Sequence, residues 1–342
     1  MPKAAYVSII IPCRNEERFI GECLDSIIAS DHPKDRLEVL VVDGMSDDKT
    51  PEILEEYARQ FSFIRVVANP KRSRSHALNL GVEHSRGEFI FRVDGHSTIE
   101  SNYVSQCLRY MEEYSADRVG GRMKIIPQDN TLMGKAIALA LTSPFGVGNA
   151  RFKTALKGDP PEWVDTVMVW CCKKDLFRKT GLFNIDMEQS EDIEYSIRLS
   201  KHGGKTLLVP SVQSHYYARS GLKACWKRNF SYGVWAILPF KYTSGMPLSL
   251  RHLVPLVFVG SLVGFGMLSL VMKFFFPLFL AIFGSYLFVS AGSSMALSFR
   301  ERNLRYFFVL PVAFATFHFA YGLGSLRGLA SLSALKLTGC SK

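Results

Sequence analysis

The first part of the chain alternates between short apolar runs and amphipathic segments. The stretches "YVSIIIPC" at 6–13 and "LEVLVVDG" at 37–44 are β-branched and apolar throughout, as in strands buried on both faces. The segments between such runs have apolar residues at helical spacing. Strands are expected at 6–13, 37–44, 63–69 and 88–95, and helices at 15–30, 47–61 and 75–85. This alternation predicts an α/β fold with right-handed βαβ units, a mostly parallel sheet and flanking helices.

Beyond residue 120 the pattern is less periodic. The stretch "SEDIEYSIRLSKHGG" at 190–204 predicts a helix with Ser190 as its N-cap, acids in its first turn and glycine at its end. "TLLVPSV" predicts a further strand. Three apolar stretches of about 20 residues follow, each long enough to cross a hydrocarbon core of ~30 Å. They lie at 253–272, 274–297 and 306–326.

Charged residues indicate how these stretches are oriented. Arg300, Arg302 and Arg305 lie between the second and third stretch, and the positive-inside rule places such a loop in the cytoplasm. Lys273 then marks an outer turn, and the far C-terminus is expected outside. We expect a multi-pass protein of the cell (inner or plasma) membrane. Its parts would be a cytoplasmic catalytic domain at 1–235, a basic amphipathic neck at 236–252 and a transmembrane helical region at 253–330.

Composition fits a membrane location better than a nucleic-acid partner. The 342 residues are 48% hydrophobic and carry a formal net charge of +10, which suits either nucleic acid or an anionic membrane surface. Because the apolar residues gather after residue 253, the membrane is favoured and no nucleic-acid partner is expected. The seven cysteines have no metal-type spacing, which favours reduced thiols. The N-terminal apolar run is too short for a signal peptide.

Polar side chains follow three of the four predicted strands. Asn15 and Glu16 follow the first strand, Asp43 ends the second, and Asp94 and His96 end the fourth. Ligands of open parallel sheets bind at the carboxyl ends of the strands, so we expect one pocket there. A carboxylate and an imidazole two positions apart suit a divalent cation, although an Asp-Gly turn beside a surface histidine gives the same letters. The sequence has no glycine-rich loop of dinucleotide or Walker spacing, which argues against dehydrogenases and P-loop kinases.

Three other segments each have two interpretations. Glu191 and Asp192 begin a predicted helix, where acids complement the helix dipole or supply a general base directed into a pocket. The basic run at 71–74 is a solvated loop or a cradle for a diphosphate. The segment "WKRNFSYGVW" at 226–235 is typical of a membrane interface, and it also suits the supply of cations to a departing phosphate.

Taken together, these stretches resemble a known enzyme family over essentially the whole chain. "VSIIIPCRNEERFIGECLDSI", "EVLVVDGMSDDKT", "FRVDGH" and "EDIEYSIRLSKHGGK", in this order, resemble an inverting family-2 glycosyltransferase of the GT-A (Rossmann-like) fold. The DGH variant, "RSRSHALNLG", "RNFSYGVW" and the apolar stretches are similar to its ExoA-like branch, which acts in succinoglycan and exopolysaccharide biosynthesis.

The resemblance implies roles for individual residues. Asp192 matches the catalytic base, and Glu191 supports the acceptor site. Asp43 matches an acid that contacts uracil, and Asp94 matches the first acid of the family's DxD motif, with His96 in place of the last acid. Asp94 and His96 are therefore the expected ligands of Mg²⁺ or Mn²⁺. The residues expected to bind the nucleotide sugar are Pro12, Asn15, Glu16, Asp43, Arg72, Arg74, Asn79, Asp94, Arg228 and Trp235.

The resemblance also implies an activity. We expect a membrane-anchored, metal-dependent, inverting hexosyltransferase that moves a single sugar from a UDP-hexose or similar donor. The expected acceptor is a hydroxyl of a lipid-linked (polyprenyl diphosphate) saccharide in cell-surface glycan assembly. A polyprenyl-phosphate sugar synthase is an alternative, and so is a non-catalytic, membrane-tethered protein that binds nucleotide sugars. The apolar stretches would either bind the acceptor or serve as an anchor alone.

Overall fold

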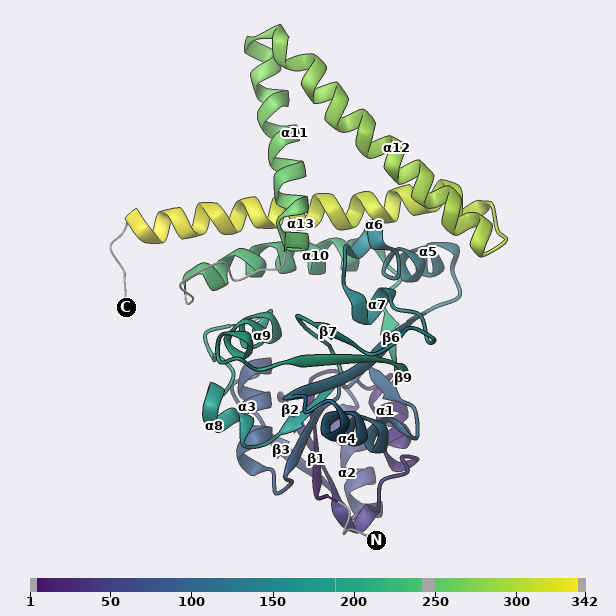
Figure 1. The fold of residues 1–342 in the computed structure, drawn as a ribbon, viewed down its shortest axis with the longest axis vertical. Coiled ribbons are helices and arrows are strands. Elements are labelled where there is room, and N and C mark those ends of the chain that lie inside the picture. Colours follow the sequence, from purple (N-terminus) through teal and green to yellow (C-terminus); the bar gives the residue numbers. More distant parts are fainter. Residues whose placement is uncertain (1–4, 188, 242–249, 338–342) are drawn as a thin grey trace. The chain divides into compact units, whose positions relative to one another are not determined.

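The protein is described from a computed structural model that covers residues 5–187, 189–241 and 250–337 (Figure 1). Its packing defines two compact units. The first consists of Met1–Lys124 and Arg151–Tyr217, and the second of Ile125–Ala150 and Ala218–Lys342. Residues 125–150 and 218–235 thus pack with the apolar helices, whereas the sequence pattern grouped them with the catalytic domain.

The first four strands and three helices of the first unit match the predicted βαβ pattern. Strands β1 to β4 are parallel neighbours in the order β3-β2-β1-β4. Strand β1 lies at the centre, and its residues Val7 to Ile11 are buried because both faces of the sheet are covered. The elements are β1 (Val7–Cys13), α1 (Ile20–Ile28), β2 (Leu37–Asp43), α2 (Thr50–Gln60), β3 (Ile64–Ala68), α3 (Arg74–His84) and β4 (Phe89–Arg92).

The other half of the sheet is antiparallel, so the sheet is mixed rather than mostly parallel. Strand β8 pairs antiparallel with β4 and with β6, and β9 pairs antiparallel with β5 and β7. The full order is β3-β2-β1-β4-β8-β6-β9-β5, with β7 beside β9. These strands are β5 (Ser97–Ile99), β6 (Arg118–Pro127), β7 (Glu162–Val164), β8 (Trp170–Lys173) and β9 (Thr206–Ala218). The predicted α/β fold with flanking helices is confirmed.

Short helices complete the first unit and cover the sheet. A continuous apolar core joins β1, β2 and β8 to helices α1 and α4. The six cysteines in the described part of the chain are free and buried. The remaining helices are the 3-10 turn Lys34–Arg36, α4 (Tyr103–Glu113), α7 (Arg151–Thr154), α8 (Leu176–Thr180) and α9 (Glu191–Lys201).

The second unit is helical and contains three helices that are long and apolar enough to cross a membrane. They are α11 (Val254–Val271), α12 (Phe276–Arg300) and α13 (Arg305–Leu337). Helix α13 continues past residue 326, where the third apolar stretch was expected to end. The predicted neck at 236–252 lies partly outside the described residues. The other elements are α5 (Leu132–Ala140), α6 (Pro144–Val147), α10 (Leu222–Ile237) and the 3-10 turns Leu238–Lys241, Leu250–His252 and Lys273–Phe275.

Candidate active site

A pocket of about 170 Å³ lies at the carboxyl ends of the parallel strands of the first unit. It opens between the loops that follow β1 and β4. The strand order reverses between these two neighbouring strands, and ligands of such sheets usually bind at this point. Several residues predicted from the sequence therefore do converge. The lining residues are Pro12, Cys13, Arg14, Glu16, Gly44, Asn69, Arg72, Ser73, Arg74, Ala77, Asp94 and His96.

The loop after β1 is fastened to the loop after β2. Asn15 has a left-handed backbone (φ 56°), which asparagine tolerates better than most residues. Its side-chain amide donates to Asp47 Oδ1 (2.7 Å) and accepts from the Asp47 backbone N–H (3.0 Å). The backbone N–H of Glu16 donates to Thr50 Oγ1 at 2.9 Å. Asn15 is thus exposed and links the two loops by hydrogen bonds, whereas Glu16 lines the pocket.

Asp43 stands at the end of β2, where its carboxylate caps a turn. It accepts a hydrogen bond from the Ser46 backbone N–H (3.1 Å) and another from the Ser46 hydroxyl. Its neighbour Gly44 lines the pocket, and Asp43 itself is half-buried behind it. Asp43 therefore caps a turn, and its contact with a nucleotide base stays a prediction.

Two arginines and two acids form a buried cluster beside the pocket. Arg74, at the start of α3, donates through Nη2 to Asp94 Oδ1, and its Nε lies 3.2 Å from Glu191 Oε1. Arg92, at the end of β4, donates from Nη2 to Asp94 Oδ1 at 3.2 Å and lies 3.8 Å from Glu191 Oε1. The end of β4 and the start of α9 are therefore joined by two guanidinium groups, and sequence reasoning had missed Arg92.

Within this cluster, the pKa values of the two acids are shifted in opposite directions. Burial would raise the pKa of Asp94, but Arg74 and Arg92 outweigh it and hold that pKa well below its usual range. Burial raises the pKa of Glu191, and neighbouring Asp192 adds to this despite the attraction of Arg74. Asp94 is consequently the more firmly ionised member of the pair.

His96 is held by Glu16 on the opposite wall of the same pocket. Its Nδ1 lies 2.7 Å from Glu16 Oε1, and its ring meets Tyr216 edge-on with centroids 5.1 Å apart. A carboxylate on one ring nitrogen orients a histidine so that the other nitrogen, here Nε2, faces a ligand or cation. Asp94 and His96 line the same pocket, which brings the two predicted cation ligands together.

The donor chemistry of these residues fits a divalent cation that is completed by substrate oxygens. Across the described segments, no three His, Cys, Asp or Glu side chains converge as a ready metal site. One or two protein ligands plus phosphate oxygens is nevertheless the common arrangement for Mg²⁺. The oxygen of Asp94 that faces the arginines is engaged, so a cation here would share that carboxylate with Arg74 and Arg92.

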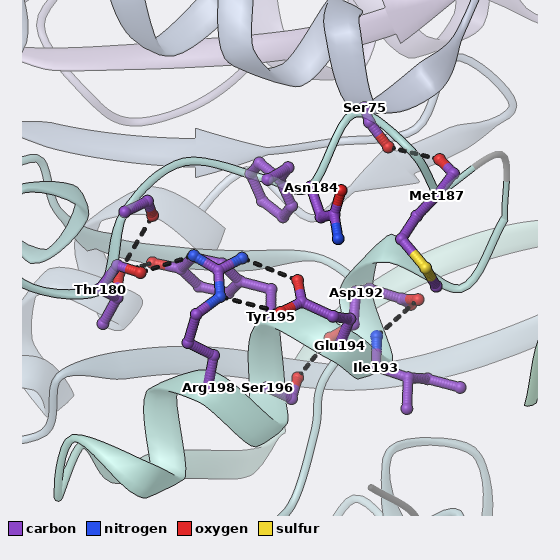
Figure 2. Close-up of polar contacts among 12 residues, drawn as sticks. Ser75, Thr180, Asn184, Met187, Asp192, Ile193, Glu194, Tyr195, Ser196 and Arg198 are labelled. Carbon is purple, nitrogen blue, oxygen red and sulfur yellow. Dashed lines mark hydrogen bonds and ion pairs between the residues drawn. The ribbon is translucent and has the colours of Figure 1, made fainter. Parts of the chain in front are cut away.

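Asp192 lies in the first turn of α9, next to Glu191. Figure 2 shows its carboxylate directed away from Glu194, on the side of the helix where Met187 lies, and it accepts from the Ile193 backbone N–H at 3.0 Å. Its charge acts on both Arg74 and Glu191 and contributes to raising the pKa of Arg74 above the usual value. Asp192 and Asp94 therefore both act electrostatically on Arg74, and the role of Asp192 as a base stays a prediction.

Helix α9 begins abruptly and is anchored on its other faces. Ser190 is its N-cap residue, as predicted, but it is left-handed (φ 61°) and its side chain makes no capping bond. Buried Arg118 of β6 donates to Ser196 Oγ (2.8 Å), which in turn donates to the Asp192 carbonyl (2.6 Å). Arg198 forms a bidentate pair with Glu194 (Figure 2). These bonds fix the helix and leave the Asp192 carboxylate outside them.

Helix α3 positions the loop that leads into α9. Ser75 Oγ donates to the Met187 carbonyl at 2.7 Å (Figure 2). One turn later, Asn79 donates to the Phe183 carbonyl and accepts from the Phe183 N–H, both at 2.9 Å. The Asn79 side chain is buried and does not line the pocket. It positions the loop at Phe183, and its contact with the donor stays a prediction.

Asn69 is a polar pocket residue that the sequence reasoning did not single out. Asn69, after β3, donates from Nδ2 to the Ser73 carbonyl, while its Oδ1 is buried with no hydrogen-bond partner among the described residues. An unsatisfied buried acceptor in a pocket wall suits a ligand N–H or O–H. Its position after the third strand, level with Asp43, was the available signal. Arg72 lines the pocket as predicted, whereas Arg228 and Trp235 belong to α10 of the second unit and stay predictions.

Residues 8–179 match the sequence profile of Glycosyl transferase family 2. A Methanococcus voltae protein, "Dolichyl N-acetyl-alpha-D-glucosaminyl phosphate 3-beta-D-2,3-diacetamido-2,3-dideoxy-beta-D-glucuronosyltransferase", is 29% identical over 67% of this chain and 72% of its own. "Probable glycosyltransferase YdaM" of Bacillus subtilis is 27% identical over 67% of this chain, and the match covers 54% of that protein.

Solved structures of similar proteins share the fold. The mannosyltransferase PcManGT from Pyrobaculum calidifontis, solved with GDP-Man and Mn²⁺, aligns over 96% of this chain and 88% of its own, with a TM-score of 0.59 and 18% identity. Residues 1–349 of S. aureus TarS, solved with UDP-GlcNAc, align over 95% of this chain and 92% of that chain, with a TM-score of 0.52 and 16% identity. The ExoA-like branch stays a prediction. The sheet with its strand-end pocket and the sequence match agree, and the chain belongs to glycosyl transferase family 2.

Proposed function

We propose that this glycosyltransferase is an inverting, cation-assisted hexosyltransferase anchored in the cell membrane. It would take one sugar from a nucleotide-diphosphate donor bound in the strand-end pocket and pass it to a hydroxyl of a lipid-linked saccharide. One observation carries the proposal: Arg74 and Arg92 join Asp94 at the pocket to Glu191, which stands beside Asp192 at the start of α9. The cluster thus ties the residue that would meet the departing diphosphate to Glu191, the neighbour in sequence of the candidate base Asp192.

On the leaving-group side, the residues of this chain orient and neutralise a diphosphate. Arg72 and Arg74 line the pocket and present guanidinium groups, which match phosphate oxygens in a bidentate manner. Asp94 and His96 would hold the divalent cation, whose bound charge would offset the negative charge that develops on the leaving diphosphate. Glu16 fixes the His96 ring, and Asn69 Oδ1 offers an acceptor to the donor molecule.

On the attacking side, Asp192 would accept the proton of the acceptor hydroxyl. Its carboxylate lies in the first turn of α9, and the four bonds that anchor the helix do not involve it. Glu191, whose pKa is raised by burial, is less suited as a general base because the arginines hold its carboxylate. A single displacement with the base and leaving group on opposite faces of the sugar inverts the anomeric centre.

The acceptor is proposed from two features. The second unit has three helices that are long and apolar enough to cross a membrane. The Methanococcus voltae relative is, by its name, a transferase that acts on a dolichyl-linked sugar phosphate. A lipid-linked saccharide that reaches the enzyme from the bilayer surface suits both features, and the same reasoning places the catalytic unit on the cytoplasmic side.

The test compares Asp192→Asn with a matched control, Asp186→Asn, in the full-length protein. Asp186 is an exposed acid of the loop before α9, so its variant controls for loss of a carboxylate in this region. With a panel of nucleotide sugars, Mn²⁺ and lipid extract, we expect Asp192→Asn to lower kcat about 10²- to 10⁴-fold while UDP binding is unchanged. Asp186→Asn should retain wild-type turnover.

Four results would overturn the proposal. Full turnover by Asp192→Asn would remove the base, and retention of anomeric configuration in the product would exclude a single displacement. Nucleotide-sugar binding without turnover of any donor would favour the non-catalytic alternative. Transfer to polyprenyl phosphate itself, with none to a saccharide hydroxyl, would favour the polyprenyl-phosphate sugar synthase.

A further inference from the structure

Helix α13 lies along α10 at very short range. A methyl group on Gly324 would fall 2.0 Å from the Phe230 carbonyl oxygen, and one on Gly233 would fall 2.0 Å from the Tyr321 carbonyl oxygen. Figure 1 shows the two helices side by side. Glycines at such crossings let helix backbones approach closely. The second half of α13 is thus fixed to α10 over at least two turns.

The first half of α13 rests on α5 and α6. Phe145 of α6 packs edge-on against Phe314, with ring centroids 4.9 Å apart. The Phe145 carbonyl also lies 2.8 Å from Nε2 of His318. One side of α13 is therefore covered along its length, first by α5 and α6 and then by α10.

The helices that cover α13 do not have the character of membrane spans. Helix α10 has 16 residues and carries exposed Lys223 and Lys227. Only three residues separate it from the end of β9 at Ala218, and four residues separate α5 from the end of β6 at Pro127. If α13 stood across the bilayer, these helices would have to stand in hydrocarbon beside it, together with their lysines, which is costly.

Helices α11 and α12 differ from α13 in what covers them. Only 11% of the apolar segment of α11 and 6% of that of α12 is buried within the protein, against 44% for α13. Side chains such as Leu270 and Phe288 are almost fully exposed, as lipid-facing residues of a spanning hairpin are. The two helices meet α13 on its other side, where Phe258 packs against Phe319 and Val259 against Gly322.

We propose that α13 lies in the plane of the membrane interface and that only the α11–α12 hairpin crosses the bilayer. Lipid headgroups and the upper acyl chains are the partner of the exposed stripe of α13, which contains Phe308, Val312, Arg327 and Ala330. An apolar stripe with a cation at headgroup depth is typical of an interfacial helix. Residues after α12 then stay on the cytoplasmic side, whereas three crossings would put residue 330 outside.

Membrane depth distinguishes the two arrangements. Phe308 and Leu329 are both exposed and stand 21 residues apart, which is about 32 Å along a helix at 1.5 Å per residue. Phe308→Cys and Leu329→Cys are labelled with a fluorophore, one at a time, in the full-length protein with Cys340→Ser, in nanodiscs. Quenching by headgroup and by mid-chain spin-labelled lipids should give the same shallow depth for both positions.

A matched pair on α11 serves as the control. Val257→Cys and Leu270→Cys are also exposed and lie about 20 Å apart on a helix that is proposed to cross, so their depths should differ clearly. Depths for residues 308 and 329 in opposite leaflets would overturn the proposal. Equal depths for residues 257 and 270 would overturn the crossing hairpin.

A second measurement is independent of these variants. Lys273→Cys, between α11 and α12, should react with a membrane-impermeant maleimide in intact cells, while Ala330→Cys should react only after permeabilisation. Reaction of Ala330→Cys in intact cells as readily as Lys273→Cys would show that α13 crosses. Protection of Lys273→Cys would show that the hairpin does not.

Discussion

Replacing Arg92 with methionine removes a guanidinium from the most buried charge cluster of the protein. Arg92 is fully buried, and its Nη2 serves both Asp94 and Glu191, at 3.2 and 3.8 Å. Methionine keeps much of the volume and removes the charge. The cluster then changes from two cations and two acids to one cation and two acids, with both acids buried and only Arg74 partly exposed.

The distances between Arg92 and the two acids set the size of the expected loss of stability. With an effective dielectric constant of about 20, charges at these separations attract by roughly 4 to 5 kcal/mol each, before the cost of desolvating Arg92 is subtracted. Breaking a buried ion pair by removing one partner typically costs about 3–5 kcal/mol. We expect the lower end, about 3 kcal/mol, because Arg74 still contacts both acids and Glu191 can take up a proton.

The assay is thermal unfolding of the detergent-solubilised protein from pH 5 to pH 8. A loss of about 3 kcal/mol corresponds to a Tm about 6–12 °C lower for a unit of this size. Loss of Arg92 raises the pKa of Glu191 further above its usual range, and a raised pKa gives stability that is lost as the pH rises. The Tm difference between Arg92→Met and wild type should therefore be smaller at pH 5 than at pH 8.

Arg65→Met is the matched control, because Arg65 contacts a single buried acid, Glu38 at 3.4 Å, and its side chain is 37% exposed. It should cost about 1 kcal/mol or less. If Arg92→Met lowers Tm no more than Arg65→Met does, the cluster is not the stabilising link between β4 and α9. A Tm difference that stays constant with pH would refute the coupling to Glu191.

Four further variants test other parts of the site. Because the pKa of Asp94 is lowered, its contribution to stability is present above its unfolded pKa of about 3.9 and is lost below it. The Tm of the wild type should therefore fall more steeply below about pH 4 than the Tm of Asp94→Asn. Asn79→Ala should destabilise by about 2 kcal/mol in urea unfolding and lower kcat, with an unchanged Kd for the donor. Glu16→Gln, which loosens the His96 ring, should weaken Mn²⁺ binding in the presence of UDP about 10- to 100-fold by calorimetry. Gly120→Ala places a methyl 2.4 Å from a backbone carbonyl and should lower Tm by the equivalent of about 1–3 kcal/mol or more.

The parallel half of the sheet was predictable, because its strands are continuous apolar runs between amphipathic helices. Most of the antiparallel half was not predictable: β5, β7 and β8 have only three or four residues each and lie between irregular segments. Only part of β9 was expected, from "TLLVPSV", because strands of three or four residues outside a regular βαβ pattern carry no periodicity of their own.

Strand-end reasoning found the pocket but missed side chains beside it. Arg92 stands in "FIFRVDG", where a cation in a buried run was a usable signal for a buried acid partner. Asn79 was among the residues expected to bind the nucleotide sugar, and the structure shows its bonds to the loop at Phe183. The direction of a polar residue on a helix depends on the neighbouring loop, here at Phe183, and the sequence of α3 alone does not contain that information.

Helix α3 has a consequence for how tolerant the enzyme is of length changes. Its first residue, Arg74, faces the donor pocket, while Ser75 and Asn79 support the loop before the candidate base. One added residue inside α3 would rotate everything after it by about 100°. Such an insertion after Arg74 would turn Ser75 and Asn79 away from that loop and disturb both substrate sites at once, whereas the exposed loop at 156–158 offers a place where chain length can vary without this penalty.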